Sequence, residues 1–214
     1  MTTKRLQKEL ILCQDTTLKE AGIYYFIKDD NMTYGTALLF GPKDTPYEFC
    51  PLEFEFRIPS DYPFVPPIVH YKTNDGRTRF HPNFYVDGKV CLSILGTWSG
   101  PKWASSMNIS TVLLSLYSIL TSNPLQHEPS FEKITLSSPK ALQYSNLVEH
   151  NLVQLFAKQY NSGYYKKWDD STFQTQLENS VQNIRTKVLE KSEEVYTQTP
   201  YSMYGSSSWK SVKI

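Results

Sequence analysis

The chain has 214 residues, of which 40% are hydrophobic and 20% charged, so it can bury a sizeable core and is not predominantly disordered. Its 22 basic and 21 acidic residues leave a net charge of +1, which gives no case for a nucleic-acid or membrane partner. The three cysteines, Cys13, Cys50 and Cys91, contain no Cys-x-x-Cys pair, so we expect no disulfide framework and no metal site.

The first predicted element is a short amphipathic helix at residues 3–13. Leu6, Leu10 and Cys13 fall on one face, and Lys4 and Lys8 on the other. Cys13 is therefore predicted to be a core thiol. No apolar segment that reads as a secretory signal follows this stretch, and no apolar run in the chain is long enough to cross a bilayer. We expect a reducing compartment, the cytoplasm or the nucleus.

Strands are predicted at residues 22–28, 33–40 and 51–58. In the third, apolar residues at 52, 54, 56 and 58 alternate with Glu53, Glu55 and Arg57. That alternation indicates one buried and one solvent-exposed face, as in an antiparallel sheet. A proline-rich crossing, RIPSDYPFVPP, leads to a fourth strand at residues 68–72.

Residues 74–107 contain no long periodic segment, which in a compact domain usually indicates either function or a wrongly assigned element. Cys91 lies here, eight residues after the triplet His81-Pro82-Asn83. The residues alone allow two interpretations of this thiol, a buried filler and an exposed nucleophile. Gly88 is predicted to permit a backbone turn ahead of it.

Three helices are predicted in the second half of the chain. One spans residues 109–122 with Asn108 as its N-cap, one runs from Ser138-Pro139 to about residue 160, and one spans residues 172–196. The last has an apolar face that must dock on the core or on a partner. Residues 197–214 are aperiodic and predicted to be mobile. The order of helix, meander, irregular segment and helices is an α+β layout.

Four motifs together resemble the ubiquitin-conjugating enzymes over residues 3–160. They are the helix KRLQKEL, the turn GPKDTPYE, the crossing SDYPFVPP, and HPN with a cysteine eight residues later. The segment NFYVDGKVCLSILGTWSGPKW and EPSFE at 128–132 are most similar to the large Z-type branch, and more distantly to the conjugating domain of the giant apoptosis-inhibitor protein.

The resemblance implies the ubiquitin-conjugating (UBC) fold, a four-stranded antiparallel meander with an N-terminal helix and C-terminal helices. It implies a catalytic core at residues 1–160, followed by a helical extension at 161–196 and a flexible tail at 197–214. Because Z-type enzymes also carry helical material after the catalytic domain, we expect the extension to dock on the core rather than to stay free for a partner.

The resemblance also implies a two-step acyl transfer. Cys91 would accept ubiquitin or a similar modifier from an activating enzyme, then pass it to a substrate lysine or to a RING or HECT-type ligase. Asn83 would stabilise the oxyanion or hold the loop. Glu128, before Pro129, would orient or deprotonate the acceptor lysine, and His127 is a weaker candidate. No cofactor is implied, because the activating enzyme uses the ATP.

Further roles follow from the same resemblance. His81 and Pro82 would fix the active-site loop, with His81 structural rather than a general base. The basic face of Lys4, Arg5 and Lys8 would meet the activating enzyme, and Phe64 would dock ligases. The chain departs from the family pattern at Trp103-Ala104-Ser105-Ser106, where Trp-Ser-Pro-Ala is common, and at Phe49-Cys50, where paired glycines are frequent. Trp98 and Trp103 are expected to anchor the inserted loop.

Two other functions are weighed against this one. A catalytically silent ubiquitin-binding variant of the same fold would not need Cys91, Asn83 and an acid together. A papain-like cysteine hydrolase would need a histidine base near the thiol, and the sequence offers four histidines: His70, His81, His127 and His150.

Overall fold

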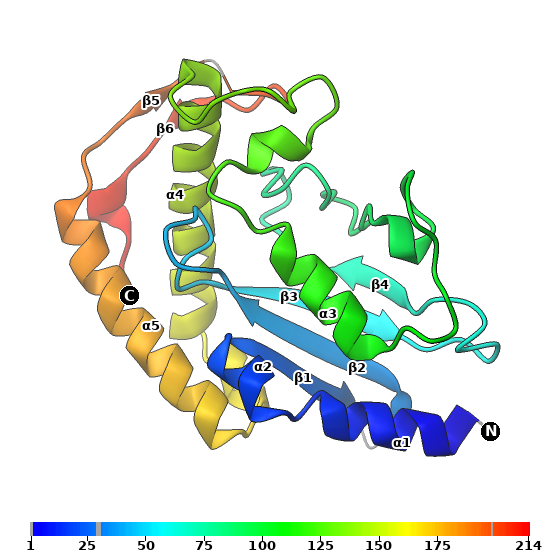
Figure 1. Cartoon of the computed structure of the whole chain (residues 1–214). Coiled ribbons are helices and arrows are strands. Elements are labelled where there is room, and N and C mark those ends of the chain that lie inside the picture. Colours follow the sequence, from blue (N-terminus) through cyan, green and yellow to red (C-terminus); the bar gives the residue numbers. More distant parts are fainter. Residues whose placement is uncertain (1, 29–30, 198) are drawn as a thin grey trace.

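The computed structural model describes residues 2–28, 31–197 and 199–214. Within these residues four strands form an antiparallel sheet in the order β1-β2-β3-β4, so each strand pairs with its neighbour in the chain. The strands are β1 (Ile23–Lys28), β2 (Asn31–Phe40), β3 (Pro51–Arg57) and β4 (Ile68–Tyr71). This is the meander that the sequence predicts, and with the helices it confirms the α+β class (Figure 1).

The helices surround this sheet. They are α1 (Thr2–Leu12), α2 (Thr16–Glu20), α3 (Ile109–Ser118), α4 (Pro139–Asn161) and α5 (Ser171–Glu190). Short 3-10 helices are η1 (Ser93–Leu95), η2 (Pro124–His127), η3 (Tyr164–Lys167) and η4 (Trp209–Ser211). The sequence did not predict α2, which is too short to show a helical period. In the described part of the chain, no helix has the length and apolar character needed to cross a membrane.

Helix α3 begins where the sequence predicts and ends early. The Thr111 amide donates to Asn108 Oδ1 (2.8 Å) and the Asn108 amide donates to Thr111 Oγ1 (3.3 Å), which is a capping box. The helix ends at Ser118, four residues before the predicted end. The carbonyl of the next residue, Ile119, instead bonds to the ring of His81 (3.0 Å). The end of α3 is thus fixed by the loop that carries the candidate site.

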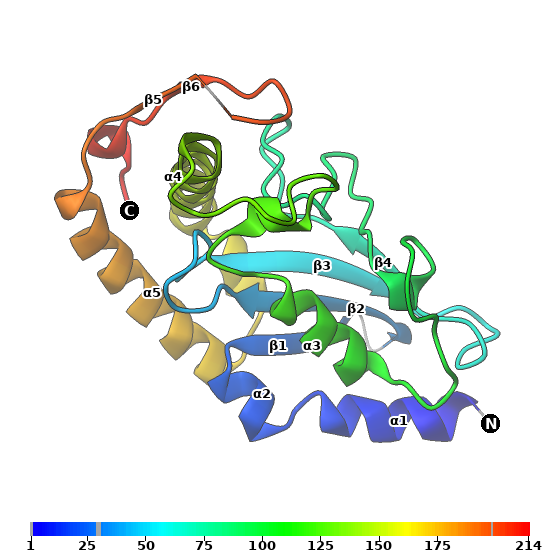
Figure 2. The ribbon, with the colours of Figure 1, turned by 45° about the horizontal axis from the view of Figure 1, so that its top comes forward.

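One face of the sheet forms the main core with α3. Residues alternating along the strands on this face, Tyr25, Leu39, Phe54 and others, are almost fully buried. They share a core cluster with the apolar stripe of α3, namely Ile109, Val112, Leu113 and Leu116. Figure 2 shows α3 lying across the sheet on this side. The period-two pattern of the strands and the helical period of α3 therefore meet as predicted.

The extension covers the other face of the sheet. The Phe173 ring of α5 packs edge-on against Tyr24 (centroids 5.3 Å apart), and the Tyr164 hydroxyl donates to Glu53 Oε2 (2.6 Å). Because of this cover, Glu53 is buried, and the prediction that it faces solvent is wrong. Four predicted apolar residues of α5 are buried, which confirms docking in cis: Phe173, Leu177, Val181 and Ile184.

Ion pairs join α5 to the core at two places. Lys19 of α2 lies 2.8 Å from Asp170, which caps α5. Further along, Lys187 Nζ lies 2.6 Å from Glu149 of α4 and 5.5 Å from the centre of the Phe49 ring. Phe49 has a left-handed φ of 70°, a conformation that glycine adopts more easily. The departure at Phe49-Cys50 thus gives Lys187 an aromatic contact at a strained backbone position.

The chain after α5 does not continue as a helix. α5 ends at Glu190, six residues before the predicted end, because the following residues pair with the tail. There β5 (Val195–Tyr196) pairs with β6 (Gly205–Ser206). The tail residue Trp209 is buried, with its ring centroid 5.0 Å from that of His150 on α4. Trp209 and Ser207 of the tail are thus buried, whereas Tyr204 is exposed, and both the flexible tail and the division at residues 160 and 196 stay predictions.

Candidate active site

Cys91 and Asn83 are joined by two hydrogen bonds. The Cys91 amide donates to the Asn83 carbonyl oxygen (2.8 Å), and Asn83 Nδ2 donates to the Cys91 carbonyl oxygen (2.7 Å). The spacing read from the sequence therefore corresponds to direct contact. Asn83 Oδ1 is buried without a hydrogen-bond partner among the described residues, which is uncommon for a buried acceptor. The Asn83 side chain holds the backbone of Cys91 in this arrangement.

The three cysteines differ in their surroundings. Cys13 and Cys50 belong to the core cluster, as the sequence predicts, whereas Cys91 does not. Burial raises the pKa of Cys13 to about 11 and raises that of Cys50 further, so neither forms much thiolate at neutral pH. Cys91 is itself only 2% exposed. It is therefore a candidate nucleophile that is enclosed by its loop rather than standing open on the surface.

A glycine turn leads the chain back to Cys91. Gly88 has φ 93°, and a Cβ there would lie 3.1 Å from the Tyr71 carbonyl oxygen. The Tyr71 amide donates to the Gly88 carbonyl oxygen (2.8 Å), which ties the turn to the end of β4. The turn predicted at Gly88 is confirmed, and it requires a residue without a side chain.

His81 is fully built into the loop. Its Nδ1 accepts from the Asn83 amide (2.9 Å), so the proton lies on Nε2, which donates to the Ile119 carbonyl oxygen (3.0 Å). Burial lowers the pKa of His81 well below its ordinary value, and the nearby His127 lowers it further. A neutral ring with both nitrogens occupied is suited to fixing the loop and unsuited to accepting a proton.

Arg79 also holds this loop in place, although no pattern in the sequence indicates that it does. Its Nε donates to the His81 carbonyl oxygen (3.1 Å), and one terminal nitrogen donates to the Pro82 carbonyl oxygen (2.6 Å). The guanidinium carbon lies 3.2 Å from the centre of the Tyr85 ring. An arginine two residues before a histidine carries no signal by itself, so only the folded loop reveals this contact.

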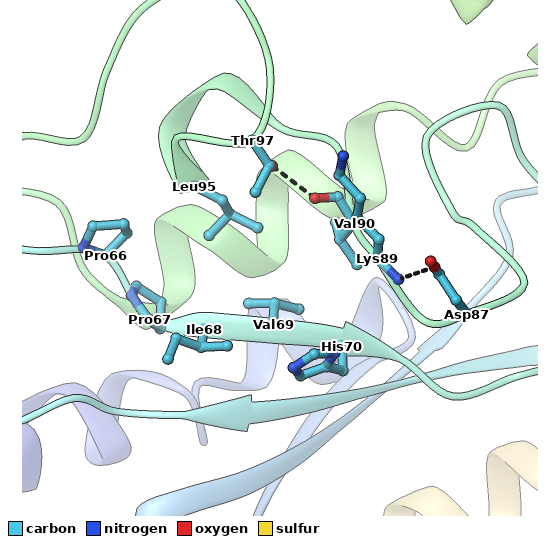
Figure 3. A pocket seen from close by; sticks show the side chains of 10 residues that line it. All are labelled: Pro66, Pro67, Ile68, Val69, His70, Asp87, Lys89, Val90, Leu95 and Thr97. Atoms are coloured by element: carbon cyan, nitrogen blue, oxygen red, sulfur yellow. Dashed lines mark hydrogen bonds between the residues drawn. The ribbon is translucent and has the colours of Figure 1, made fainter.

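Thr97 holds the segment after Cys91. Its hydroxyl donates to the Val90 carbonyl oxygen (2.6 Å) and accepts from the Leu92 amide (2.9 Å). Figure 3 shows Thr97 and Leu95 on one side of a cavity of about 340 Å³, with β4 on the opposite side. The residues flanking Cys91 are therefore fixed from both directions, by Asn83 before the thiol and Thr97 after it.

Glu128 lies just after η2, and a residue of the tail binds it. The Tyr201 hydroxyl donates to Glu128 Oε2 at 2.5 Å, across 73 positions of sequence. His127 beside it packs against His81 with the two rings tilted by 42° and their centroids 5.1 Å apart, which places η2 against the loop of Asn83. Burial lowers the pKa of His127, so its ring is mostly neutral near pH 7. No sequence pattern pointed to Tyr201.

Among the described residues, no three His, Cys, Asp or Glu side chains gather as a metal site requires. The candidate groups are a thiol held by an asparagine clamp and, just after η2, a carboxylate held by a tyrosine. This is a set of groups for acyl transfer through sulfur.

The model of the ubiquitin-conjugating enzyme family matches residues 5–151, which include Asn83, Cys91 and Glu128. The chain belongs to the ubiquitin-conjugating enzyme family. Among similar proteins, the Xenopus tropicalis ubiquitin-conjugating enzyme E2 Z is 44% identical over 135 residues, covering 63% of this chain and 43% of its own. The human E2 Z is 46% identical over 126 residues, covering 58% of this chain and 35% of its own. The chain thus spans less than half the length of these curated relatives.

Two further comparisons support the family. The human dual E2 ubiquitin-conjugating enzyme/E3 ubiquitin-protein ligase BIRC6 is 35% identical over 163 residues, covering 72% of this chain and 3% of its own. A solved ubiquitin-conjugating enzyme E2 domain from Toxoplasma gondii superposes with a TM-score of 0.54 at 27% identity, covering 71% of this chain and 98% of that domain. The fold is therefore the UBC fold, and the α5 helix and the tail lie beyond the family match.

The basic face predicted on α1 is only partly free. Lys4 and Lys8 are exposed. Arg5 instead donates to Glu9 (2.7 Å) and to the Met107 carbonyl oxygen (2.6 Å). The buried Glu9 also accepts from the Ile109 amide (3.1 Å), so it ties α1 to the start of α3. Arg5 thus has an internal role that the sequence did not predict.

The predicted ligase-docking aromatic is on the surface. Phe64 is 80% exposed, in the crossing between β3 and β4. Nearby, Trp103 Nε1 donates to the Pro63 carbonyl oxygen (2.7 Å), which anchors the inserted loop as predicted. Trp98 is 46% exposed, so the prediction that it anchors this loop by packing is wrong.

Proposed function

We propose that this protein carries ubiquitin or a ubiquitin-like modifier on Cys91 and transfers it to an acceptor. In the first step the Cys91 thiolate attacks the thioester that joins the modifier to its activating enzyme. A new sulfur–carbon bond forms at Cys91, the old one breaks, and the activating enzyme leaves as a thiolate that takes up the proton of Cys91. No cofactor is needed here, since the activating enzyme has already used the ATP.

The observation that carries this proposal is the mutual clamp of Asn83 and Cys91 in a chain of the ubiquitin-conjugating family. A thioester carrier must hold an acylated sulfur in one geometry until an acceptor arrives. The clamp supports that task, because Asn83 binds the backbone of the cysteine and leaves the thiol free of hydrogen bonds to it.

In the second step a lysine amine attacks the Cys91 thioester. The carbon–nitrogen bond forms, the carbon–sulfur bond breaks, and Cys91 leaves as a thiolate, which takes up the proton that the nitrogen loses as it becomes an amide. A free lysine has a pKa near 10.4, so the amine must lose a proton to attack at neutral pH. We assign the role of orienting or deprotonating it to the Glu128 carboxylate. Transfer to a ligase cysteine needs no such help, because a thiol ionises more easily.

A cysteine hydrolase finds no support in the surroundings of His81. A hydrolase base must have a ring nitrogen free to take the proton of the thiol. Both nitrogens of His81 are hydrogen-bonded, one to the Asn83 amide and one to the Ile119 carbonyl oxygen, and burial lowers its pKa.

The family indicates three classes of partner protein: an activating enzyme, a ligase and a substrate. We place the activating enzyme on the exposed Lys4 and Lys8 of α1, with Arg5 beside them, and a RING or HECT-type ligase on the exposed Phe64. The substrate is a protein lysine. We assign the protein to the cytoplasm or the nucleus, where its three free cysteines stay reduced.

The test is a charging assay on the full chain with a panel of activating-enzyme and modifier pairs. With ATP and one matching pair, a non-reducing gel should show an adduct one modifier heavier, and a reducing agent should remove it. A chain that forms no thiol-sensitive adduct with any pair would overturn the proposal.

A further inference from the structure

The hydroxyl of Tyr201 donates a 2.5 Å hydrogen bond to the carboxylate of Glu128. This bond joins the family domain to the chain that follows it. Glu128 lies within the family match of residues 5–151, and Tyr201 lies 50 residues beyond its end. A hydrogen bond to a charged acceptor is short and about twice as strong as a neutral one. The candidate acid is thus held by a residue that the family domain does not contain.

The backbone at Tyr201 is strained. Tyr201 has φ 61° and the next residue, Ser202, has φ 54°, both in the left-handed region. Such conformations are unfavourable for residues other than glycine and persist where surrounding contacts impose them. Two in succession turn the tail so that the Tyr201 side chain meets Glu128.

The same tail turn also contacts the loop of Cys91. The guanidinium carbon of Arg79 lies 5.2 Å from the centre of the Tyr201 ring, and the Arg79 amide lies 3.3 Å from the Met203 sulfur. Arg79 in turn binds the carbonyl groups of His81 and Pro82. The Tyr201 ring therefore packs on the brace of the loop, while its hydroxyl holds the carboxylate.

We propose that Tyr201 is a positioning residue for Glu128, so that the C-terminal tail controls transfer to lysine. This inference rests on the function proposed above. The hydroxyl fixes one carboxylate oxygen, which restricts rotation of the glutamate side chain and leaves the other oxygen to meet the acceptor amine. Burial raises the pKa of the Tyr201 hydroxyl well above its ordinary value, and the bond to Glu128 raises it further. Tyr201 is therefore a donor at every pH at which transfer is measured.

Removal of the Tyr201 hydroxyl oxygen alone distinguishes the positioning role from a packing role. Tyr201→Phe keeps the ring against Arg79 and removes the bond to Glu128. We expect lysine discharge from the preformed thioester to slow by about tenfold, because a misplaced carboxylate loses much of its catalytic effect. Discharge to a small thiol such as 2-mercaptoethanol should change by less than about twofold, since a thiol needs no help from Glu128.

The experiment measures single-turnover discharge for the full-length wild type, Tyr201→Phe, Glu128→Gln and the double variant. If Tyr201 acts through Glu128, the double variant discharges to lysine no more than about twofold slower than Glu128→Gln. Tyr204→Phe is the matched control, because Tyr204 lies in the same tail and is 84% exposed. It should discharge at the wild-type rate.

Several outcomes would overturn the inference. In one, Tyr201→Phe discharges to lysine as fast as the wild type, or faster, which would mean that the tail masks Glu128. In another, both acceptors slow equally, which would indicate a merely structural role. In a third, the full Tyr201→Phe defect persists without Glu128. A wild type that forms no thioester would instead defeat the proposed function, and the inference with it.

Discussion

The loop that carries Cys91 and the carboxylate of Glu128 belong to one candidate site, yet different parts of the chain hold them. Asn83 reaches Cys91 across eight positions, and His81 reaches Asn83 across two. Glu128 is held by Tyr201 across 73 positions. The first arrangement joins residues of one short motif that lies inside the family match. The second depends on the extension, which lies beyond the family match. The two parts of the candidate site are therefore held by contacts of very different range along the chain.

The largest expected effect concerns the thiol itself. Cys91→Ala should abolish the thioester, and Cys91→Ser should give an adduct that resists reducing agents, because an oxygen ester replaces the thioester. A gel run with and without reductant reads both results. Cys13→Ala is the control, since Cys13 is a core thiol with a raised pKa. This variant should still form the modifier thioester. A thioester that still forms in Cys91→Ala would mean that Cys91 does not carry the modifier, and the comparison would lose its first part.

The next largest effect is on stability, and it tests whether helix α5 of the extension is docked on the sheet. Phe173→Ala removes a fully buried ring from between α5 and the sheet, so it should cost about 3–5 kcal/mol of stability. The melting temperature should fall by roughly 10 °C. Leu189→Ala, on the same helix at 86% exposure, is the matched control and should melt like the wild type. Equal melting temperatures for all three would mean that α5 is not docked in solution.

Asn83→Ala should slow lysine discharge by about a hundredfold, the usual cost of removing an oxyanion donor or its support. Its effect on charging should be much smaller, because the thiol exchange of charging demands less of the loop than aminolysis. Single-turnover rates of the two steps give the ratio. An equal loss in both steps would mean that Asn83 only maintains the fold of the loop.

The smallest of these effects is on Glu128. Glu128→Ala should slow lysine discharge by about tenfold near pH 7, with transfer to a thiol nearly unchanged. The measurement is the rate for each acceptor from the same preformed thioester. Glu132→Ala, an exposed carboxylate four residues away, is the control and should behave as the wild type. If both variants slow discharge alike, the general negative charge of the loop matters rather than Glu128.

Local patterns in the sequence predicted what local contacts build. The capped start of α3 at Asn108, the alternation in β3 and the turn at Gly88 all depend on residues close in sequence. Contacts between residues distant in sequence can override the local pattern, and these could not be predicted in this way. Glu53 reads as a solvent-facing residue until Tyr164 covers it.

The missed parts of the site are also long-range. Nothing near Tyr201 in the sequence indicates a carboxylate partner, and a Ser- and Tyr-rich tail is typical of a mobile end. Arg79 was missed because its two backbone acceptors line up only once the loop is folded. The sequence thus predicts local contacts better than the long-range contacts that position the candidate residues.

The central claim is that the Asn83 loop acts on the thioester and Glu128 acts on the amine. The pH dependence of lysine discharge from about pH 6.5 to about pH 9.5 tests it most directly, because the fraction of neutral amine rises through this range toward its pKa near 10.4. The defect of Glu128→Ala should shrink as the pH rises, since the amine then needs less help to lose its proton. The defect of Asn83→Ala should stay constant. Parallel curves, with the Glu128→Ala defect the same at every pH, would contradict the account.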